Sequence, residues 1–162
     1  MSEGDGGYFT WLSGAPSRPE VVLGDARTSL EREAPNHYDV IVVDAFSGDS
    51  VPTHLLTKEA FELYRSHLAS DSSVLALHVS NRYLRLLPVV ARLARELGLH
   101  SLVVDVDKGP DWALSSLWVL LSKDPQSLKL DVPADDASTL ADVVEGPLWT
   151  DEFTSLWGLV EW

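Results

Sequence analysis

The chain has 162 residues, 45% of them hydrophobic, and this length predicts a single domain (residues 1–162) that is large enough to bury a core. Its 25 acidic and 12 basic side chains give a net charge of −13, which argues against nucleic-acid binding and is compatible with a cationic small-molecule partner or with solubility alone. The chain has no cysteine, no secretory signal and no apolar run near the roughly 20 residues that span a bilayer, so we expect a cytoplasmic protein without disulfides or membrane contact.

Five short apolar runs are predicted to form strands. In chain order they are "EVVLGDA" (20–26), "YDVIVVDA" (38–45), "SVLALHVS" (73–80), "HSLVVDV" (100–106) and "SSLWVLLS" (115–122). Several are continuous runs of Val, Leu and Ile, which is typical of parallel strands covered on both faces.

Two longer segments between these runs have the periodicity of amphipathic helices. They are "LLTKEAFELYRSHLA" (55–69), with an apolar stripe from Leu56 to Leu68, and "LRLLPVVARLARELG" (84–98), with Pro88 suited to its first turn and Gly98 to its end. Strands that alternate with helices predict an α/β fold, a mostly parallel open sheet of about five strands with helices on both faces.

The tail, residues 125–162, differs from the rest of the chain. An acidic connector with a proline (131–136) is followed by predicted helical stretches near 135–145 and 151–160. Trp149, Trp157 and Trp162 lie in this tail. Because a solvated tail would not hold three tryptophans, we expect it to pack on the domain or on a second subunit.

Polar groups follow three of the predicted strands. They are Gly24, Asp25 and Ala26 after the first, Asp44 and Asp49 after the second, and His78, Ser80 and Asn81 after the third. In open α/β sheets, ligands gather at the carboxyl ends of the strands. Two neighbouring carboxylates there can hold an ammonium group or accept a proton from it. The alternative is that Asp44 only caps the turn that follows its strand.

The sequence gives little support to metal-dependent, phosphate-binding or nucleophilic chemistry. The five histidines do not have the spacing of a metal site, so we expect no metal. Phosphate-binding, nucleophile-elbow and zinc-protease motifs do not occur, and no serine stands in a setting typical of a nucleophile.

Several ordered segments resemble the spermidine synthase (polyamine aminopropyltransferase) family, and most closely its bacterial spermidine-synthase-like branch. They are "EVVLGDAR", "YDVIVVDAFSGDSVPTHLLTKEAFELYRSHL", "LALHVSNRYL" and the tail segment "PLWTDEFTSLWGLV". Together they extend from about Tyr8 to Val160.

The resemblance implies a methyltransferase-like Rossmann fold, with decarboxylated S-adenosylmethionine as co-substrate and no tightly bound cofactor. It implies that Asp25 accepts the adenine amino group, with Gly24 and Ala26 beside it. It also implies that Asp44 orients and deprotonates the attacking amine. Asp49 corresponds to the acid that helps to hold the polyamine, and we assign His78 and Asn81 to substrate binding with it.

Two features depart from that family. The usual D-x-x-D-P spacing is replaced by Asp44 and Asp49 with Ser-Val-Pro after them. The strand, Gly-rich cofactor loop and helix that begin the family are also missing, apart from "GDGG" at 4–7. In the methyltransferase-type strand order 3-2-1-4-5-7-6, strands 1 and 2 would then be absent. We therefore expect either direct pairing of 20–26 with 38–45 or a homodimer or higher homo-oligomer that fills the gap.

Three functions follow as alternatives. The first is aminopropyl transfer from decarboxylated S-adenosylmethionine to a polyamine such as putrescine, in which a partner chain could complete the site. The second is a non-catalytic, self-associating remnant that binds a polyamine or a partner protein. The third is an S-adenosylmethionine-dependent methyltransferase, for which a carboxylate pair suited to a cationic acceptor is less appropriate.

Overall fold

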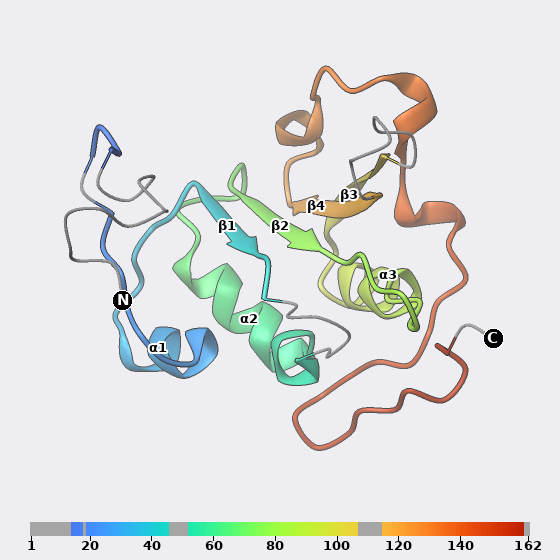
Figure 1. Cartoon of the computed structure of the whole chain (residues 1–162), viewed down its shortest axis with the longest axis horizontal. Helices are drawn as coiled ribbons and strands as arrows, with labels where there is room; N and C mark the ends of the chain where they lie inside the picture. Colours follow the sequence, from blue (N-terminus) through green and yellow to red (C-terminus); the bar gives the residue numbers. More distant parts are fainter. Residues whose placement is uncertain (1–13, 18, 46–51, 107–114, 161–162) are drawn as a thin grey trace.

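A computed structural model describes residues 14–17, 19–45, 52–106 and 115–160. A five-stranded open sheet with the order β1-β2-β4-β3-β5 forms its centre (Figure 1). The strands are β1 Val40–Val43, β2 Val74–His78, β3 His100–Val106, β4 Ser116–Ser122 and β5 Ala137–Ser138. The α-helices are α1 Ala26–Arg32, α2 Lys58–His67 and α3 Leu87–Glu96, and 3-10 helices cover Thr53–Leu55, Pro125–Leu128, Ala134–Asp136 and Leu140–Asp142. Within the described ranges, no helix is both long and apolar enough to cross a membrane.

The sheet is mostly antiparallel, so the prediction of a mostly parallel sheet is wrong. Among the described strands, only β1 and β2 pair in parallel, whereas β2 with β4, β4 with β3 and β3 with β5 are antiparallel. An apolar run predicts that a strand is buried but does not fix its direction. The chain between β3 and β4 is too short for a crossover helix, which parallel neighbours need, so β4 returns beside β3.

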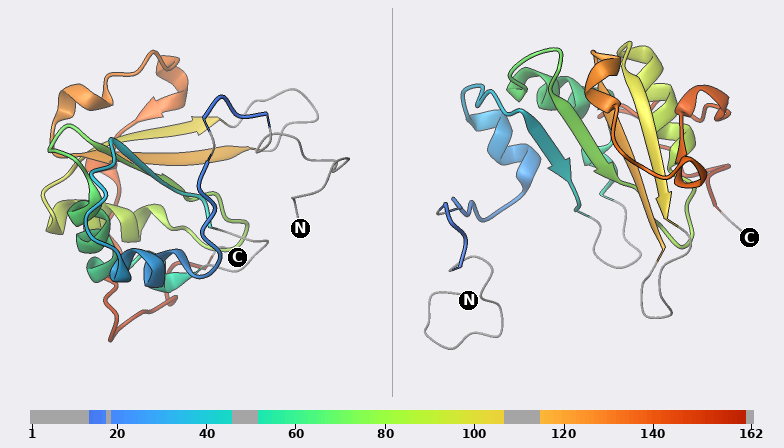
Figure 2. Two further views of the ribbon diagram at one scale, coloured as in Figure 1. Left: turned by 90° about the vertical axis from the view of Figure 1, so that its left-hand side faces the viewer. Right: turned by 90° about the horizontal axis from the view of Figure 1, so that it is seen from above.

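All three α-helices lie on the same face of the sheet (Figure 2, left), so the prediction of helices on both faces is wrong for the described part of the chain. Alternate residues of the strands turn toward these helices, where Leu75, Leu77 and Val119 are buried. On the opposite face of β1, Val40 and Val42 are 54% and 57% exposed. The described residues therefore form one sheet with one layer of α-helices.

The strand predicted at 20–26 does not form. Val21, Val22 and Leu23 are exposed in an irregular segment, and α1 begins directly after Asp25. Gly24 has a φ of +135°, which suits glycine and breaks an extended run. A strand is stable only when its backbone pairs with a neighbour, and no described strand pairs with this segment, so the expected pairing of 20–26 with 38–45 does not form.

The two central helices are confirmed, and their ends have clear local causes. Thr57 caps α2 by accepting a hydrogen bond from the Ala60 N–H at 3.2 Å. Pro88 lies in the first turn of α3, and Gly98 follows its end with a φ of +59°. The predicted apolar stripes face the sheet, with Phe61 of α2 fully buried in the core.

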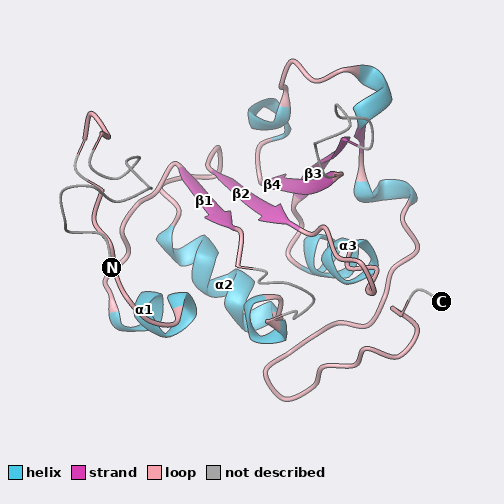
Figure 3. Cartoon of the chain, viewed as in Figure 1, coloured by secondary structure: helices cyan, strands magenta, loops and turns pink. Residues whose placement is uncertain are grey.

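The tail contains no α-helix in its described residues: of the helical stretches predicted near 135–145 and 151–160, the first contains as helix only the short 3-10 helices Ala134–Asp136 and Leu140–Asp142, and the second does not form in the described residues. Figure 3 draws residues 143–160 as loop. The backbone of the tail instead forms hydrogen bonds with distant segments: the Gly146 N–H donates to Pro88 O, and the Lys58 N–H donates to Trp149 O, both at 2.9 Å. Trp149 is fully buried, and its indole N–H donates to the Ser155 carbonyl at 3.0 Å. Trp162 lies outside the described residues.

Candidate functional site

The first polar cluster lies at the carboxyl ends of the two parallel strands. Asp44 directly follows β1, and His78 is the last residue of β2. Parallel neighbours bring their carboxyl ends to one edge of the sheet, and there Asp44 Oδ1 lies 2.7 Å from His78 Nδ1. The Asp44 side chain is 55% exposed, so it is open to a ligand from solvent.

Contacts at both ring nitrogens and on one face hold the imidazole of His78. Its Nε2 lies 2.8 Å from Ser80 Oγ, which also accepts the Leu117 backbone N–H at 2.7 Å. The indole of Trp118 stacks on the ring, with centroids 4.8 Å apart and planes at 19°. Trp118 reaches this position because the antiparallel register places it opposite His78 on β4. The ring is therefore fixed at both nitrogens and on one face.

Asn81 lies next to this cluster and has a structural task. Its Oδ1 accepts the backbone N–H groups of Tyr83 and Leu84, both at 2.9 Å, and so closes a turn. Its Nδ2 is buried without a hydrogen-bond partner in the part of the chain that the structure describes. Its assignment to substrate binding stays a prediction. Asp49, the other residue of that assignment, lies outside the described residues.

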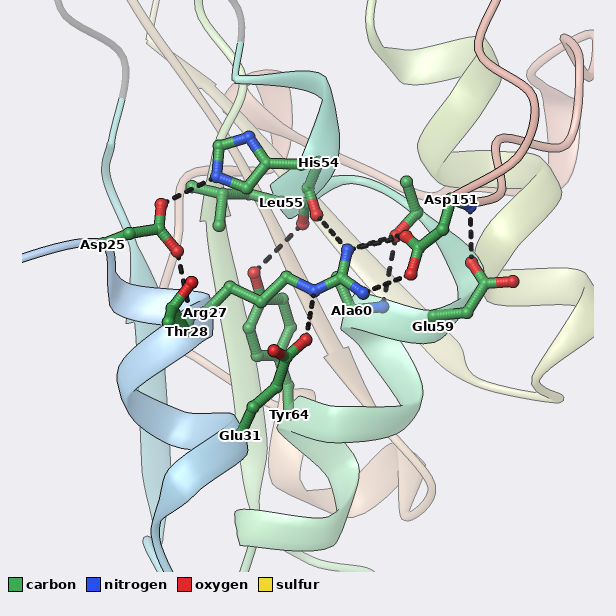
Figure 4. Close-up of polar contacts among 11 residues, drawn as sticks. Asp25, Arg27, Thr28, Glu31, His54, Leu55, Glu59, Ala60, Tyr64 and Asp151 are labelled. Atoms are coloured by element: carbon green, nitrogen blue, oxygen red, sulfur yellow. Dashed lines mark hydrogen bonds and ion pairs between the residues drawn. The ribbon is translucent and has the colours of Figure 1, made fainter.

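A second cluster surrounds Asp25 (Figure 4). Asp25 is the N-cap of α1, where Oδ1 accepts the Thr28 N–H at 2.9 Å, and its Oδ2 lies 2.8 Å from His54 Nε2. The backbone hydrogen bond from Thr28 and the hydrogen bond to His54 lower the pKa of Asp25 to about 2. Gly24 precedes this cap and Ala26 is the first residue of the helix. The predicted contacts of these three residues with adenine stay predictions.

Arg27 connects this cluster to the tail and to the start of α2. It forms a paired contact with the carboxylate of Asp151, its Nη1 donates to the His54 carbonyl at 2.8 Å, and its Nε lies 2.9 Å from Glu31 (Figure 4). The hydrogen bond to Asp151 raises the pKa of Arg27 further above its ordinary value and lowers the pKa of Asp151. Thr57 donates to the same carboxylate at 2.8 Å. These contacts tie three distant segments together.

The two clusters are separate within the described residues: no hydrogen bond or ion pair joins Asp25 to Asp44. A cavity of about 340 Å³ lies beside the second cluster, lined by Asp25, Arg27, His54, Asp151 and several threonines. In the described part of the chain, no group of His, Cys, Asp or Glu side chains is arranged to hold a metal.

Four residues of these clusters have roles that the sequence did not indicate. They are Arg27, His54, Trp118 and Asp151. The sequence offers His54 only as one of five histidines without metal spacing and Asp151 only as the start of a predicted helix, and neither feature indicates a partner far along the chain. Trp118 could have been found only from the β2–β4 register, which the sequence does not specify.

The lowered pKa of Asp25 predicts a loss of stability in acid. Because folding lowers this pKa from 3.8 to about 2, ionised Asp25 stabilises the fold above about pH 4, and this contribution disappears as the pH falls through about 2. Asp25→Asn keeps a good N-cap but has no charge to titrate. Urea midpoints measured from about pH 5 to about pH 2 should therefore fall less steeply in Asp25→Asn than in wild type. Equal slopes for the two proteins would contradict the assignment.

Fold and site together define a mixed α/β protein with a carboxylate–imidazole pair at the carboxyl edge of its parallel strands. No family model matches the chain. A segment of 57 residues, 34% of the chain, is 42% identical to a polyamine aminopropyltransferase of Vibrio vulnificus (strain CMCP6). The match covers 19% of the length of that protein. The chain is therefore similar to part of a spermidine-synthase-like protein.

Proposed function

We propose that the chain binds a polyamine at Asp44 and takes part in aminopropyl transfer to it. The observation that carries the proposal is the exposed carboxylate of Asp44, held by His78 at the carboxyl edge of two parallel strands. A cationic amine is the ligand class that such a carboxylate attracts, and the net charge of −13 favours its approach. The partial similarity to a polyamine aminopropyltransferase supports the same class of substrate.

The strand order supports a methyltransferase-like origin for the fold. The observed order β1-β2-β4-β3 has the pattern of positions 4-5-7-6 in the strand order that the family resemblance implies. In that arrangement Asp44 follows the fourth position and His78 the fifth. Both residues then lie at the edge where ligands bind in open α/β sheets.

The chemistry assigns a simple task to Asp44. An ammonium group has no lone pair for attack, so it must first transfer a proton, and Asp44 is placed to accept it. The amine nitrogen then forms a bond to the aminopropyl methylene carbon that is attached to the sulfonium of decarboxylated S-adenosylmethionine. The carbon–sulfur bond breaks with its electron pair moving to sulfur, which leaves methylthioadenosine as the neutral thioether.

The transfer is tested by incubating the chain with putrescine and decarboxylated S-adenosylmethionine and measuring products by mass spectrometry. We expect spermidine and methylthioadenosine in equal amounts. Asp44→Asn, incubated in parallel, is the control for spontaneous reaction. Formation of neither product above this control would contradict transfer by the chain on its own.

One observation favours a second candidate, an amine-binding protein without transferase activity. Both oxygens of Asp25 already have partners, the α1 backbone and His54, so an adenine amino group must share this carboxylate. Calorimetric titration with methylthioadenosine separates the two functions. Binding that disappears in Asp25→Ala supports the transferase, and amine binding without nucleoside binding supports the second candidate.

Self-association through β1 is a further part of the proposal. Among the described strands β1 pairs only with β2, and Val40 and Val42 leave an exposed apolar surface at this edge. Unpaired edges of this kind favour pairing with another chain. We expect wild type to sediment as a dimer or larger oligomer at micromolar concentration and a Val40→Lys/Val42→Lys variant to sediment as a folded monomer. A stable wild-type monomer would contradict this expectation.

A further inference from the structure

We infer that His78 is a positioning residue that orients Asp44 for amine binding, in a neutral form with its proton on Nδ1, and that Ser80 and Leu117 fix this form. The inference rests on the proposed role of Asp44. It assigns tasks to Ser80 and Leu117 that the family resemblance does not imply.

The order of donors and acceptors rests on two groups with fixed roles: the backbone N–H of Leu117, which only donates, and the carboxylate of Asp44, which only accepts. Leu117 donates to Ser80 Oγ at 2.7 Å and occupies one of its lone pairs, and the Ser80 hydroxyl hydrogen can then donate to His78 Nε2 at 2.8 Å. A ring nitrogen that accepts a hydrogen bond has no proton. The proton of a neutral ring is then on Nδ1, where it donates to Asp44 Oδ1 at 2.7 Å.

This order has a consequence for the charge at the site. A neutral donor orients the carboxylate and leaves its negative charge available to a cation, whereas an imidazolium would compensate that charge. The hydrogen bond from His78 engages Oδ1, and Oδ2 of Asp44 has no hydrogen bond within the described residues. An incoming ammonium can therefore approach Oδ2.

The ring itself has little freedom to turn. Stacking on Trp118 fixes its plane, and hydrogen bonds at both nitrogens fix its rotation within that plane. A side chain held by these contacts loses little entropy when the ligand binds, as a positioning group requires.

The tautomer is measured directly, without any ligand. Long-range proton–nitrogen NMR correlation on uniformly ¹⁵N-labelled protein near pH 7.5 distinguishes protonated from unprotonated ring nitrogens. We expect His78 to have a proton on Nδ1 and none on Nε2. In Asp44→Asn, the side-chain carbonyl oxygen can still accept from Nδ1, so we expect the proton to stay on Nδ1, where Ser80 and Leu117 hold it. A proton on Nε2 in wild type, alone or together with one on Nδ1, would overturn the inference.

A matched pair of variants tests the positioning role. The side-chain NH₂ of His78→Asn can replace the Nδ1 donor, whereas His78→Ala removes it. We expect calorimetry to show roughly tenfold weaker putrescine binding in His78→Ala and recovery of most of this loss in His78→Asn. His100→Ala, at the exposed start of β3, is the control and should bind as wild type does. Equal weakening in the Ala and Asn variants would overturn the positioning role.

The tautomer measurement and the binding measurement can each contradict the inference separately. A wrong tautomer overturns the hydrogen-bond order even when putrescine binds at Asp44. A correct tautomer with unchanged amine affinity in His78→Ala overturns the positioning role and leaves the proposed function intact. Absence of putrescine binding in wild type contradicts the proposed function, and the positioning role with it.

Discussion

Replacing Asp44 with asparagine is expected to weaken putrescine binding by a factor of ten to more than a hundred. The ammonium group loses an ionised partner, and a hydrogen bond to a charged group is worth about 1.5–3 kcal/mol. Asparagine has nearly the same size and can still contact His78, so the loss would report the charge rather than the packing. Calorimetric titration of both proteins under identical salt measures the difference.

The matched control for this variant is Asp39→Asn. Asp39 directly precedes β1, whereas Asp44 follows it, so the two variants lose the same charge at opposite ends of one strand. We expect Asp39→Asn to bind putrescine with nearly the affinity of wild type. Equal weakening in both variants would mean that the net charge of the chain, rather than a site at Asp44, determines amine binding.

Replacing Trp149 with alanine is expected to lower the free energy of unfolding by about 3–5 kcal/mol. Trp149 is fully buried in the core, and it anchors a tail that contains no α-helix in its described residues. Its removal leaves a large cavity and frees the carbonyl of Ser155. Urea denaturation followed by circular dichroism gives the difference, provided that the slope of the transition is unchanged.

Trp157 provides the matched control. It lies in the same tail but is 92% exposed, so Trp157→Ala should change the free energy of unfolding by no more than about 0.5 kcal/mol. A small effect at Trp149 would mean that the tail is not part of the folded core. A large effect at Trp157 would indicate that a contact covers it in solution.

The elements with strong local signals could be predicted from the sequence. Four of the five predicted strands and both central helices form, because each has an uninterrupted apolar run or a complete apolar stripe. The strand predicted at 20–26 does not form, although the edge of β1 is unpaired among the described strands, because Gly24 with its φ of +135° breaks the extended run. Strand direction failed because it depends on the connection between β3 and β4 rather than on composition.

The part of the site that lies at the ends of strands could be predicted from the sequence. Asp44 and His78 were found because they end apolar runs that lie side by side, and the structure brings them to 2.7 Å. The contact between Arg27 and Asp151 joins residues 124 positions apart, and no local pattern specifies it. Helix propensity in the tail was overridden by tertiary contacts such as that of Gly146 with Pro88.

Comparing putrescine with 1,4-butanediol as ligands of the wild-type chain tests most directly whether the site at Asp44 recognises a cationic amine. The two molecules have the same length and differ in charge, so a carboxylate site must distinguish them. Calorimetry at low salt is predicted to give saturable binding of putrescine, with one site per chain, and no binding of the diol. No saturable putrescine binding, or equal binding of both ligands, would contradict an amine site at Asp44.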